Sequence, residues 1–477
     1  MNKNKNIFFE MLIPIVFLMI GISIFCHPMF LNLDKMPGDY SDARFINYVL
    51  EHGYLWFNNI DIHKSFWDLP IFYPHKNTLA YSDIMLGAMI IYSPIRFFIK
   101  NPQTAFQLFY IVILVLNFVS FYFLAKRFKL NCLYSSFAAY FFTFCLVRHA
   151  QTIHLQLFWQ FYSILSVLCF SLMLSESPKL KNRLLFIGGV AFFILQLYTA
   201  FYFGWYMSFC LPIFLVACLL NKNARDKLIG WFKNFDKFNL ITLLVGFFSL
   251  IPLCYHYLLV GSKFAKAEPS SLLHLLFSQS FLDSLVIDYS YFYFPEALLG
   301  VGLITSILIM VAIFKNKYRI PITFFILILI LSFCNRHVYS FLYDNFFPMG
   351  AIRVLGRYVF VLIPIYALVL AFYLKSFKKV WVSIAIMTLI VIEQIPYVSY
   401  FDWEKSGHEK RIARFSHNNE CDVVFYKFKN DAEFMKNNLD VMWYSSNNNK
   451  YCVNEYSGFV FEYDVSKFDK KCSLIVK

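Results

Sequence analysis

The chain has 477 residues, of which 59% are hydrophobic and only 15% are charged. Soluble domains carry about 25% charged residues, so this composition excludes an ordinary soluble enzyme and indicates a membrane protein with several spans. The net charge of +14 does not indicate a nucleic-acid partner, because Lys and Arg gather in the short loops between apolar runs. That clustering is the topology signal of a membrane protein, so we expect membrane lipids as partners and no nucleic acid.

The first apolar run covers residues 8–31 and follows two basic residues, Lys3 and Lys5. The run is long and no small-residue cleavage site follows it, so we expect a retained first span that acts as a signal anchor. Basic flanks stay on the cytoplasmic side. This places the N-terminus inside and makes residues 32–104 a long first outer loop.

A charged segment, residues 36–45 (MPGDYSDARF), opens the first outer loop and is called the acidic loop below. Residues 42–57 follow with spaced apolar positions, which predicts an amphipathic helix lying on the membrane surface. In a structural interpretation, Asp39 caps that helix and Asp42 lies in its first turn, where a carboxylate meets the helix dipole. In a functional interpretation, one carboxylate is a general base and the other binds a metal ion or orients an acceptor.

The end of the first outer loop contains a second apolar stretch, residues 84–99, which is short and interrupted by Pro94. Its length favours a re-entrant or surface helix over a full span. Asp83 directly precedes it. A turn or N-cap role is the simpler interpretation of this carboxylate, and a role in substrate binding is the alternative.

We expect about eleven helices to cross the membrane, counting the first. The others are predicted near residues 105–125, 133–148, 155–175, 184–198, 201–220, 238–259, 298–314, 319–334, 357–374 and 380–399. Five basic loops, at 126–129, 179–183, 222–227, 315–319 and 375–379, then fall on the same side as the N-terminus. An added or missing span would break this agreement after it, so the distribution of charge supports the count.

Two pairs of polar residues lie at predicted outer ends of later spans. His154 and Gln156 open one span, where a single His is more often an interfacial residue than a substrate ligand. Arg353 and Arg357 precede another span and share one helix face if that helix starts early. Arg binds phosphate through two parallel hydrogen bonds, whereas snorkelling toward lipid headgroups is the alternative.

From residue 401 the chain becomes polar and rich in Asn and Lys, which divides it into a membrane domain, 1–400, and a small outer domain, 401–477. Residues 421–428 and 458–463 are typical of strands, and 432–438 of a short helix. We therefore expect a small extracytoplasmic α+β domain at the end of the chain.

The chain has 11 cysteines and no CxxC pair, so the sequence does not predict a zinc or thioredoxin-like site. Cys421, Cys452 and Cys472 lie in the predicted outer domain. One disulfide can form there if the compartment is oxidising, but three thiols cannot all pair.

Several short motifs combine with this layout. They are Gly38-Asp39 with Asp42, residues 50–54 (LEHGY), 72–74 (FYP), Ser82-Asp83, 154–156 (HLQ), Arg353 with Arg357, 442–443 (MW) and 454–459 (NEYSGF). Over most of the chain the pattern resembles the GT-C superfamily of membrane glycosyltransferases, and within it a bacterial subfamily. The resemblance implies an α-helical polytopic fold in a bacterial plasma membrane, with interfacial helices and a long first outer loop.

The resemblance also implies an activity: transfer of a sugar from a polyprenyl-phosphate-linked donor to a cell-envelope glycan, lipid or other acceptor on the outer face. It implies that Asp39 is the catalytic carboxylate and Asp42 the second acid. Arg353 and Arg357 would contact the donor phosphate. The residues expected around the substrates are Arg44, Asp83, His154 and Gln156.

Metal use varies within the superfamily, so a divalent ion such as Mg²⁺ or Mn²⁺, held by Asp39 and Asp42, stays open, and no other cofactor is expected. The oligosaccharyltransferase branch carries a WWD-type motif in its outer domain. This chain has no such motif, so transfer to Asn of proteins is not expected.

Two other classes of protein remain as alternatives. A surface-polysaccharide polymerase or ligase places functional Arg and His in a late outer loop, and Arg336 and His337 keep this class open. A transporter or assembly protein for lipid-linked precursors should carry ionisable residues in mid-span and show repeated halves. The charges here gather at one face and no repeat is visible, which favours the enzyme.

Overall fold

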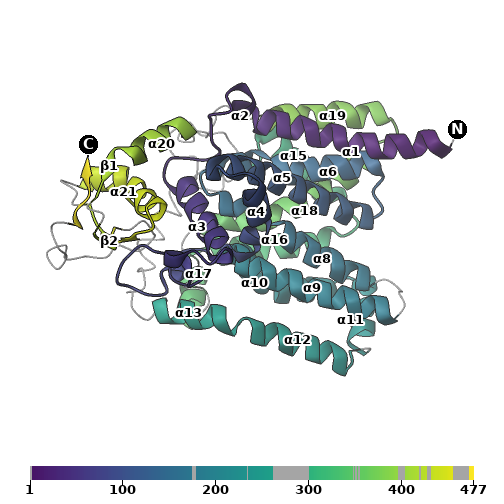
Figure 1. Cartoon of the computed structure of the whole chain (residues 1–477). Helices are drawn as coiled ribbons and strands as arrows, with labels where there is room; N and C mark the ends of the chain where they lie inside the picture. The colour runs from purple at the N-terminus through teal and green to yellow at the C-terminus, as the bar shows by residue number, and fades with distance from the viewer. Residues whose placement is uncertain are drawn as a thin grey trace.

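Figure 1 shows the computed structural model of the chain, a bundle of helices with the N-terminus at one end and the C-terminal elements at the other. The structure describes residues 3–174, 179–233, 235–261, 300–346, 349, 352, 355–395, 403–417, 420–426, 431–454 and 472–476. Arg353 and the predicted strand 458–463 lie outside the described residues.

The first half of the chain supplies the helices that surround the acidic loop. They are α1 (Lys3–Phe25), α2 (His27–Leu31), α3 (Asp42–Phe57), η1 (Asp61–His63), η2 (Thr78–Tyr81), α4 (Leu86–Phe98), α5 (Pro102–Arg127), α6 (Cys132–Phe144), α7 (Leu146–Ala150), η3 (Leu155–Phe158), α8 (Phe161–Met173), α9 (Lys179–Thr199) and α10 (Phe201–Leu219). Local sequence sets several of these starts. Asn101 caps α5 by accepting the Thr104 N–H at 2.8 Å, and Pro102 occupies the first helical position.

The second half continues the bundle with α11 (Lys222–Lys233), α12 (Lys237–Ser249), α13 (Ile251–Gly261), α15 (Leu303–Lys315), α16 (Arg319–Cys334), α17 (Arg336–Asn345), η7 (Leu355–Tyr358), α18 (Val359–Lys375) and α19 (Val380–Glu393). Asp236 caps α12 through the Asn239 N–H at 3.1 Å. In the bundle, α5 packs against α6 and α8, α8 against α9, and α6 against α1 and α18.

Within the described residues, six helices are long and apolar enough to cross a membrane: Pro102–Arg127, Leu155–Met173, Leu180–Thr199, Phe201–Leu219, Lys237–Gly261 and Gly356–Lys375. A pair bent by 78°, Arg319–Phe333 with His337–Asn345, passes the same test as one span. Shorter apolar helices are Glu10–Phe25, Leu86–Phe98, Leu303–Lys315 and Val380–Glu393. The helical membrane fold is thus confirmed, whereas the number eleven stays a prediction.

The predicted span at 133–148 is interrupted. Helix α6 ends at Phe144, because Cys145 adopts an extended backbone conformation with φ −71° and ψ 157°. The chain then forms α7 and η3 before α8 begins. This broken stretch lies beside the acidic loop, where the site below is built.

Several of the predicted basic loops lie together with the start of the chain. The Cys132 thiol donates to the carbonyl of Glu10 at 3.1 Å, and Lys375 Nζ donates to the carbonyl of Lys129 at 2.9 Å. The C-terminal elements occupy the opposite end of the bundle (Figure 1). These contacts agree with a common side for the basic loops, and the compartment that this side faces stays a prediction.

Helix α3 has the bounds that the sequence predicts, but other parts of the protein enclose most of it, and its place at the membrane surface stays a prediction. Residues 43–53 are all buried. The helix contacts α4, α5, η3 and the C-terminal helix α21 (Asp431–Asn447). Its polar residues Glu51 and His52 are satisfied by protein partners in place of water, which is why a helix that looks amphipathic can be enclosed.

The C-terminal domain combines α20 (Lys405–Ala413), α21 and four two-residue strands, β1 (Phe415–Ser416), β2 (Val423–Val424), β3 (Tyr451–Cys452) and β4 (Ile475–Val476). Strand β1 pairs antiparallel with β4, and β2 pairs parallel with β3. The predicted strand at 421–428 shortens to β2, and the predicted short helix at 432–438 becomes the longer α21. The sequence pattern missed α20.

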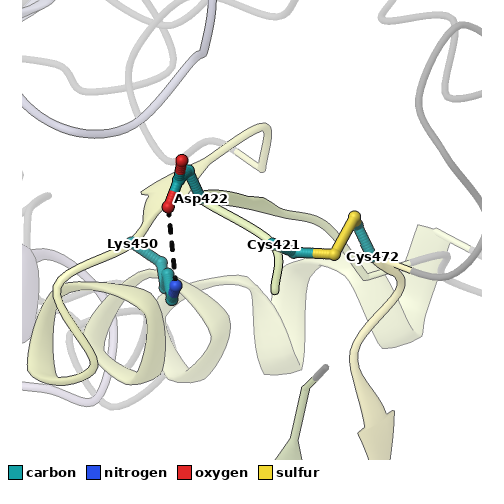
Figure 2. Close-up of a disulfide and its surroundings, with 4 residues drawn as sticks. All are labelled: Cys421, Asp422, Lys450 and Cys472. Carbon is teal, nitrogen blue, oxygen red and sulfur yellow. Dashed lines mark ion pairs between the residues drawn. A yellow bond between two sulfur atoms is a disulfide. The ribbon is translucent and has the colours of Figure 1, made fainter. Parts of the chain in front are cut away.

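One disulfide, Cys421–Cys472, joins the start of β2 to the segment before β4 (Figure 2). Beside it, Lys450 Nζ lies 3.7 Å from Oδ1 of the exposed Asp422. Cys452 is buried and reduced. The structure therefore contains one disulfide in this domain, as the sequence allowed, and identifies its two cysteines.

The outer domain shares its core with the membrane domain. One continuous cluster of buried apolar side chains runs from α1 and α3 to Trp403, Trp443 and Leu474. The backbone joins them as well, since Cys452 N–H donates to the carbonyl of Pro70 at 2.9 Å and its own carbonyl accepts Tyr73 N–H at 2.9 Å. The C-terminal domain therefore packs directly against the first outer loop.

Candidate active site at the acidic loop

Asp39 lies just before α3 and supports the first turn of that helix. Its Oδ1 accepts the backbone N–H of Ala43 at 2.9 Å, and its Oδ2 accepts the Ser41 hydroxyl. Gly38 has φ +88°, and a side chain there would overlap Ala43. The capping interaction that the structural interpretation predicted for Asp39 is therefore present, although Ser41 occupies the N-cap position itself.

Asp42 is the first residue of α3 and meets a residue far away in the sequence. Its Oδ2 lies 2.7 Å from Nδ1 of His154, whose side chain is 9% exposed, whereas that of Asp42 is 37% exposed. The acidic loop also packs against this segment at Gly38, because a Cβ added there would lie 3.0 Å from the carbonyl oxygen of Thr152. The structure thus brings together Asp39, Asp42 and His154, which the sequence singled out separately.

The two carboxylates have different electrostatic surroundings. Burial raises the pKa of Asp39, and the neighbouring charge of Asp42 raises it further, against hydrogen bonds from Ser41 and Ala43. The potential of His154 acts in the opposite direction on the same carboxyl. Asp39 is therefore held in place by its own loop, and Asp42 is the carboxylate of the pair with more access to solvent and to a reactant.

A fully buried arginine organises the broken stretch that carries His154. Arg148 donates from Nε to the carbonyl of Phe142 at 2.6 Å, from Nη1 to that of Leu157 at 3.2 Å, and from Nη2 to the amide oxygen of Gln160. Gln160 in turn donates to the carbonyl of Phe360 at 3.1 Å. These bonds replace the helical hydrogen bonds lost at the break and tie the segment to the first turn of α18.

Arg357 and Asp83 each contact a residue at the start of α10. The Arg357 guanidinium lies 4.9 Å from the ring centroid of Tyr202, and the residue is 9% exposed. Its Nε is buried and has no hydrogen-bond partner among the described residues. Asp83 accepts the backbone N–H of Phe201, the residue before Tyr202, at 3.0 Å. Asp83 therefore supports the first turn of α10, whereas Met85 occupies the N-cap position of α4, the helix that follows Asp83 in sequence.

The other two residues predicted around the substrates have separate surroundings. Gln156 is half-buried, and its Oε1 has no hydrogen-bond partner within the described part of the chain. Arg44 is fully buried and turned toward the C-terminal domain, where Nη1 lies 2.6 Å from Oδ1 of Asp440 and Nε donates to Nδ1 of His408 at 2.7 Å. Arg44 thus belongs to a contact between domains.

No motif in the sequence pairs Arg44 with its partners. Asp440 is one acid in a polar domain, and no charge pattern marks it as a partner of Arg44. The same holds for Gln160, whose amide joins two helices that are distant in sequence. Only hydrophobic context could have found them, since both lie among apolar residues such as Val441 and Phe158.

A divalent metal ion held by Asp39 and Asp42 stays a prediction. Among the described residues, no group of three or more His, Cys, Asp and Glu side chains converges as a set of metal ligands. Asp39 is engaged by its own loop and Asp42 by His154. We therefore derive no step through a metal ion.

No known family model matches the chain, and no curated protein matches it in sequence. Among solved structures, the archaeal oligosaccharyltransferase AglB from Archaeoglobus fulgidus, in complex with an inhibitory peptide and a dolichol-phosphate, is similar with a TM-score of 0.54 and 10% identity. That similarity covers 94% of this chain and 64% of AglB.

A crystal structure of the Archaeoglobus fulgidus oligosaccharyltransferase with Zn and sulfate has a TM-score of 0.49 and 12% identity, over 93% of this chain and 62% of that one. The chain thus spans less than two thirds of the length of either structure. What the AglB complex establishes for this chain is a shared fold.

Proposed function

We propose that this protein is a membrane glycosyltransferase of the GT-C type that transfers a sugar from a lipid-phosphate donor to an acceptor hydroxyl. The observation that carries the proposal is the Asp42–His154 pair beside Asp39, set on a fold shared with an oligosaccharyltransferase. AglB was solved with a dolichol-phosphate and a peptide, which are ligands of that protein. For this chain we propose a polyprenyl-phosphate donor and a glycan or lipid of the bacterial cell envelope as acceptor.

In the proposed reaction, Asp42 is the general base. The acceptor oxygen forms a bond to the anomeric carbon of the donor sugar while the bond from that carbon to the phosphate oxygen breaks. The acceptor proton passes to Asp42, and the lipid phosphate leaves with its negative charge. Asp42 suits this role better than Asp39, because its carboxylate is 37% exposed and 2.7 Å from His154. Asp39 holds the loop and adds negative potential.

Arg357 is the proposed contact for the departing phosphate. A guanidinium stabilises charge that develops on phosphate oxygens, and the effect grows where water is excluded. The side chain is buried against Tyr202, and its Nε has no described hydrogen-bond partner. Arg353 is proposed as a second contact from the sequence alone.

The test is transfer by the purified full chain, with a polyprenyl-phosphate sugar as donor and release of polyprenyl phosphate as the readout. We expect Asp42→Asn to lower turnover at least about a hundredfold, the usual range for a lost general base. Asp39→Asn keeps an amide oxygen for Ala43 N–H and should lose less.

The matched control is Asp61→Asn, since Asp61 lies in the same loop with a side chain 73% exposed and paired with the exposed Lys64. It should retain full turnover. If Asp42→Asn and Asp61→Asn release polyprenyl phosphate equally fast, Asp42 is not the base and the proposed mechanism fails.

A further inference from the structure

Asp440 is the most heavily engaged carboxylate at the junction of the two domains. It lies on α21, its side chain is 0% exposed, and its Oδ1 lies 2.6 Å from Nη1 of Arg44 and 2.6 Å from the Tyr40 hydroxyl. Its Oδ2 accepts Nε of Arg411 at 3.2 Å and Nη2 of Arg414 at 3.0 Å. One buried negative charge thus joins three arginines and a tyrosine.

Two of these four donors belong to the acidic loop and flank its carboxylates. Tyr40 follows Asp39, and Arg44 comes two residues after Asp42. The Tyr40 ring also lies between two guanidinium groups, 4.4 Å from Arg44 and 4.2 Å from Arg411. The loop therefore has one side bound to the C-terminal domain and the other side, through Asp42, facing His154.

A second set of bonds fixes the start of the same loop. Met36 N–H donates to the carbonyl of Trp403 at 3.0 Å, and the Trp403 indole donates to the carbonyl of Pro37 at 3.1 Å. The segment around Lys35 also pairs with Glu404 as an antiparallel bridge. After Pro37, it is Asp440 that continues the attachment to the C-terminal domain, through Tyr40 and Arg44.

We propose that Asp440 is a positioning residue, which through Arg44 and Tyr40 fixes the acidic loop in the orientation that presents Asp42 to His154. The proposal rests on the proposed function, because only there is Asp42 a catalytic residue. It makes the C-terminal domain a part of the active site without requiring that domain to touch the reacting atoms.

The charge balance explains why a neutral side chain cannot replace Asp440. Arg44 is buried, and its second partner, His408, accepts a hydrogen bond and brings no negative charge. Without the carboxylate, the buried Arg44 and the partly exposed Arg411 and Arg414 would lose the negative charge that they share. The least costly relief is for Arg44 and Tyr40 to move outward, which would turn the loop that carries Asp42.

The test is hydrogen–deuterium exchange of the purified full chain, followed by mass spectrometry of the peptide that contains residues 36–45. Asp440→Asn keeps the size of the side chain and removes its charge. We expect exchange in this peptide to become at least about tenfold faster, as for the loss of a charge-assisted hydrogen bond. Tyr40→Phe removes only the 2.6 Å hydrogen bond and should give a smaller change in the same peptide.

Asp422→Asn is the control, because Asp422 lies in the same domain with a side chain 94% exposed and an ion pair of 3.7 Å (Figure 2). It should leave exchange of residues 36–45 unchanged. Unchanged exchange in both Asp440→Asn and Tyr40→Phe would overturn the proposal, and so would faster exchange together with full transferase turnover. Should Asp440→Asn fail to accumulate, Tyr40→Phe alone decides by the same criteria.

Two further measurements separate positioning from general structural damage. Binding of polyprenyl phosphate should be unchanged in Asp440→Asn while turnover falls at least about tenfold, because the loop and not Arg357 has moved. A parallel loss of donor binding would instead indicate a general loss of structure and overturn the proposal. An active Asp42→Asn would refute the proposed function, while the exchange measurement would still report whether Asp440 holds the loop.

Discussion

Arg357 places a guanidinium among aromatic rings at the end of a membrane span. The residue is 9% exposed, and its guanidinium lies over the ring of Tyr202. Tyr202 belongs to a buried cluster that also includes Tyr206 and Phe333. Burying a charge is costly unless a partner offsets it, and an aromatic face supplies only about 0.5–2 kcal/mol. An anion bound at Arg357 would offset more of this free-energy cost, which is the physical basis for assigning the donor phosphate to Arg357.

We predict that Arg357→Gln weakens binding of polyprenyl phosphate about tenfold or more, because a hydrogen bond to a charged group contributes about 1.5–3 kcal/mol. Trp205 belongs to the same buried cluster as Tyr202, so its fluorescence can report the titration. Arg225→Gln, at a 45% exposed arginine on α11, is the matched control. Equal affinity in the two variants would remove Arg357 from the phosphate site.

At the scale of single residues, the sequence predicted the site unevenly. Asp39, Asp42 and His154 could be proposed together because charged and polar residues are rare in this chain and their predicted positions share one face. The different roles of the two carboxylates could not be predicted, because they depend on which carboxylate accepts the helix N–H and which lies next to His154. Arg44 looked like a substrate ligand because its partner, Asp440, is almost four hundred positions away and carries no local signal.

Helices α3 and α4 are joined by a buried ion pair. Glu51 accepts from Arg96 Nη2 at 2.9 Å and from Arg96 Nε at 2.9 Å, and the Tyr92 hydroxyl donates to the same carboxylate at 2.9 Å. The two charged side chains are 9% and 14% exposed. Because α3 starts with Asp42 of the proposed site, this ion pair connects the site to α4.

We predict that Glu51→Ala lowers the free energy of unfolding by about 3–5 kcal/mol, because it leaves Arg96 buried and unpaired. Thermal unfolding of the purified chain measures the effect. Glu404→Ala is the control, since its ion pair with Lys35 is 44% and 34% exposed and should contribute about 0–1 kcal/mol. A change for Glu51→Ala no larger than that of the control would contradict the prediction.

The contact between the first outer loop and α21 contains two adjoining histidines. Nδ1 of His52 lies 2.8 Å from Nδ1 of His63, and Nε2 of His63 lies 3.1 Å from the Ser446 hydroxyl. Burial lowers the pKa of His52 to about 4, against the hydrogen bond that its ring donates to the Phe66 carbonyl and against the charge of Asp68. Burial also lowers the pKa of His63 to about 2, and His52 adds to this shift. Both rings are therefore neutral in the folded protein.

This contact should weaken in acid. The unfolded histidines have a pKa of about 6.5, so their contribution to stability is complete above that pH and falls as the pH drops toward the folded values. Between pH 7 and pH 5 we expect a loss of about 2 kcal/mol for each histidine, seen as a lower melting temperature. The double variant His52→Gln, His63→Gln should flatten this dependence. His75→Gln changes an exposed histidine and should leave the dependence of the melting temperature on pH as it is. An equal dependence in the double variant and in His75→Gln would refute the prediction.

At the scale of elements, helix positions could be predicted and their surroundings could not. The bounds of α3 followed from its first-turn acid and apolar spacing. Its burial could not be predicted, because it results from packing against α4, α5, η3 and the C-terminal helix α21. The break after Phe144 was missed because residues 133–147 contain no charge, Gly or Pro, and the bonds of Arg148 that make the break tolerable are made to residues on both sides of it.

The disulfide contributes to the stability of the whole C-terminal domain. Cys421 and Cys472 are 51 positions apart, and closing a loop of that length in the unfolded chain corresponds to about 4 kcal/mol in the chain-entropy model. We predict that Cys421→Ser lowers the melting temperature and speeds exchange in α21. Cys452→Ser changes a reduced thiol and serves as the control. Matching behaviour of the two variants would argue against a stabilising disulfide.

The two ends of the molecule carry features that are typical of different compartments. One end carries basic loops such as those of Lys129 and Lys375, and basic loops of membrane proteins are typically cytoplasmic, whereas the other end carries a disulfide, a bond that is typical of an oxidising space. Both features are explained if the C-terminal domain lies outside the cytoplasm. We therefore predict that alkaline phosphatase fused after residue 477 is active, and that the same enzyme inserted in the basic loop 315–319 is inactive. The reverse result would move the acidic loop, Arg357 and the C-terminal domain to the cytoplasmic face together, and it would exclude a donor presented on the outer side.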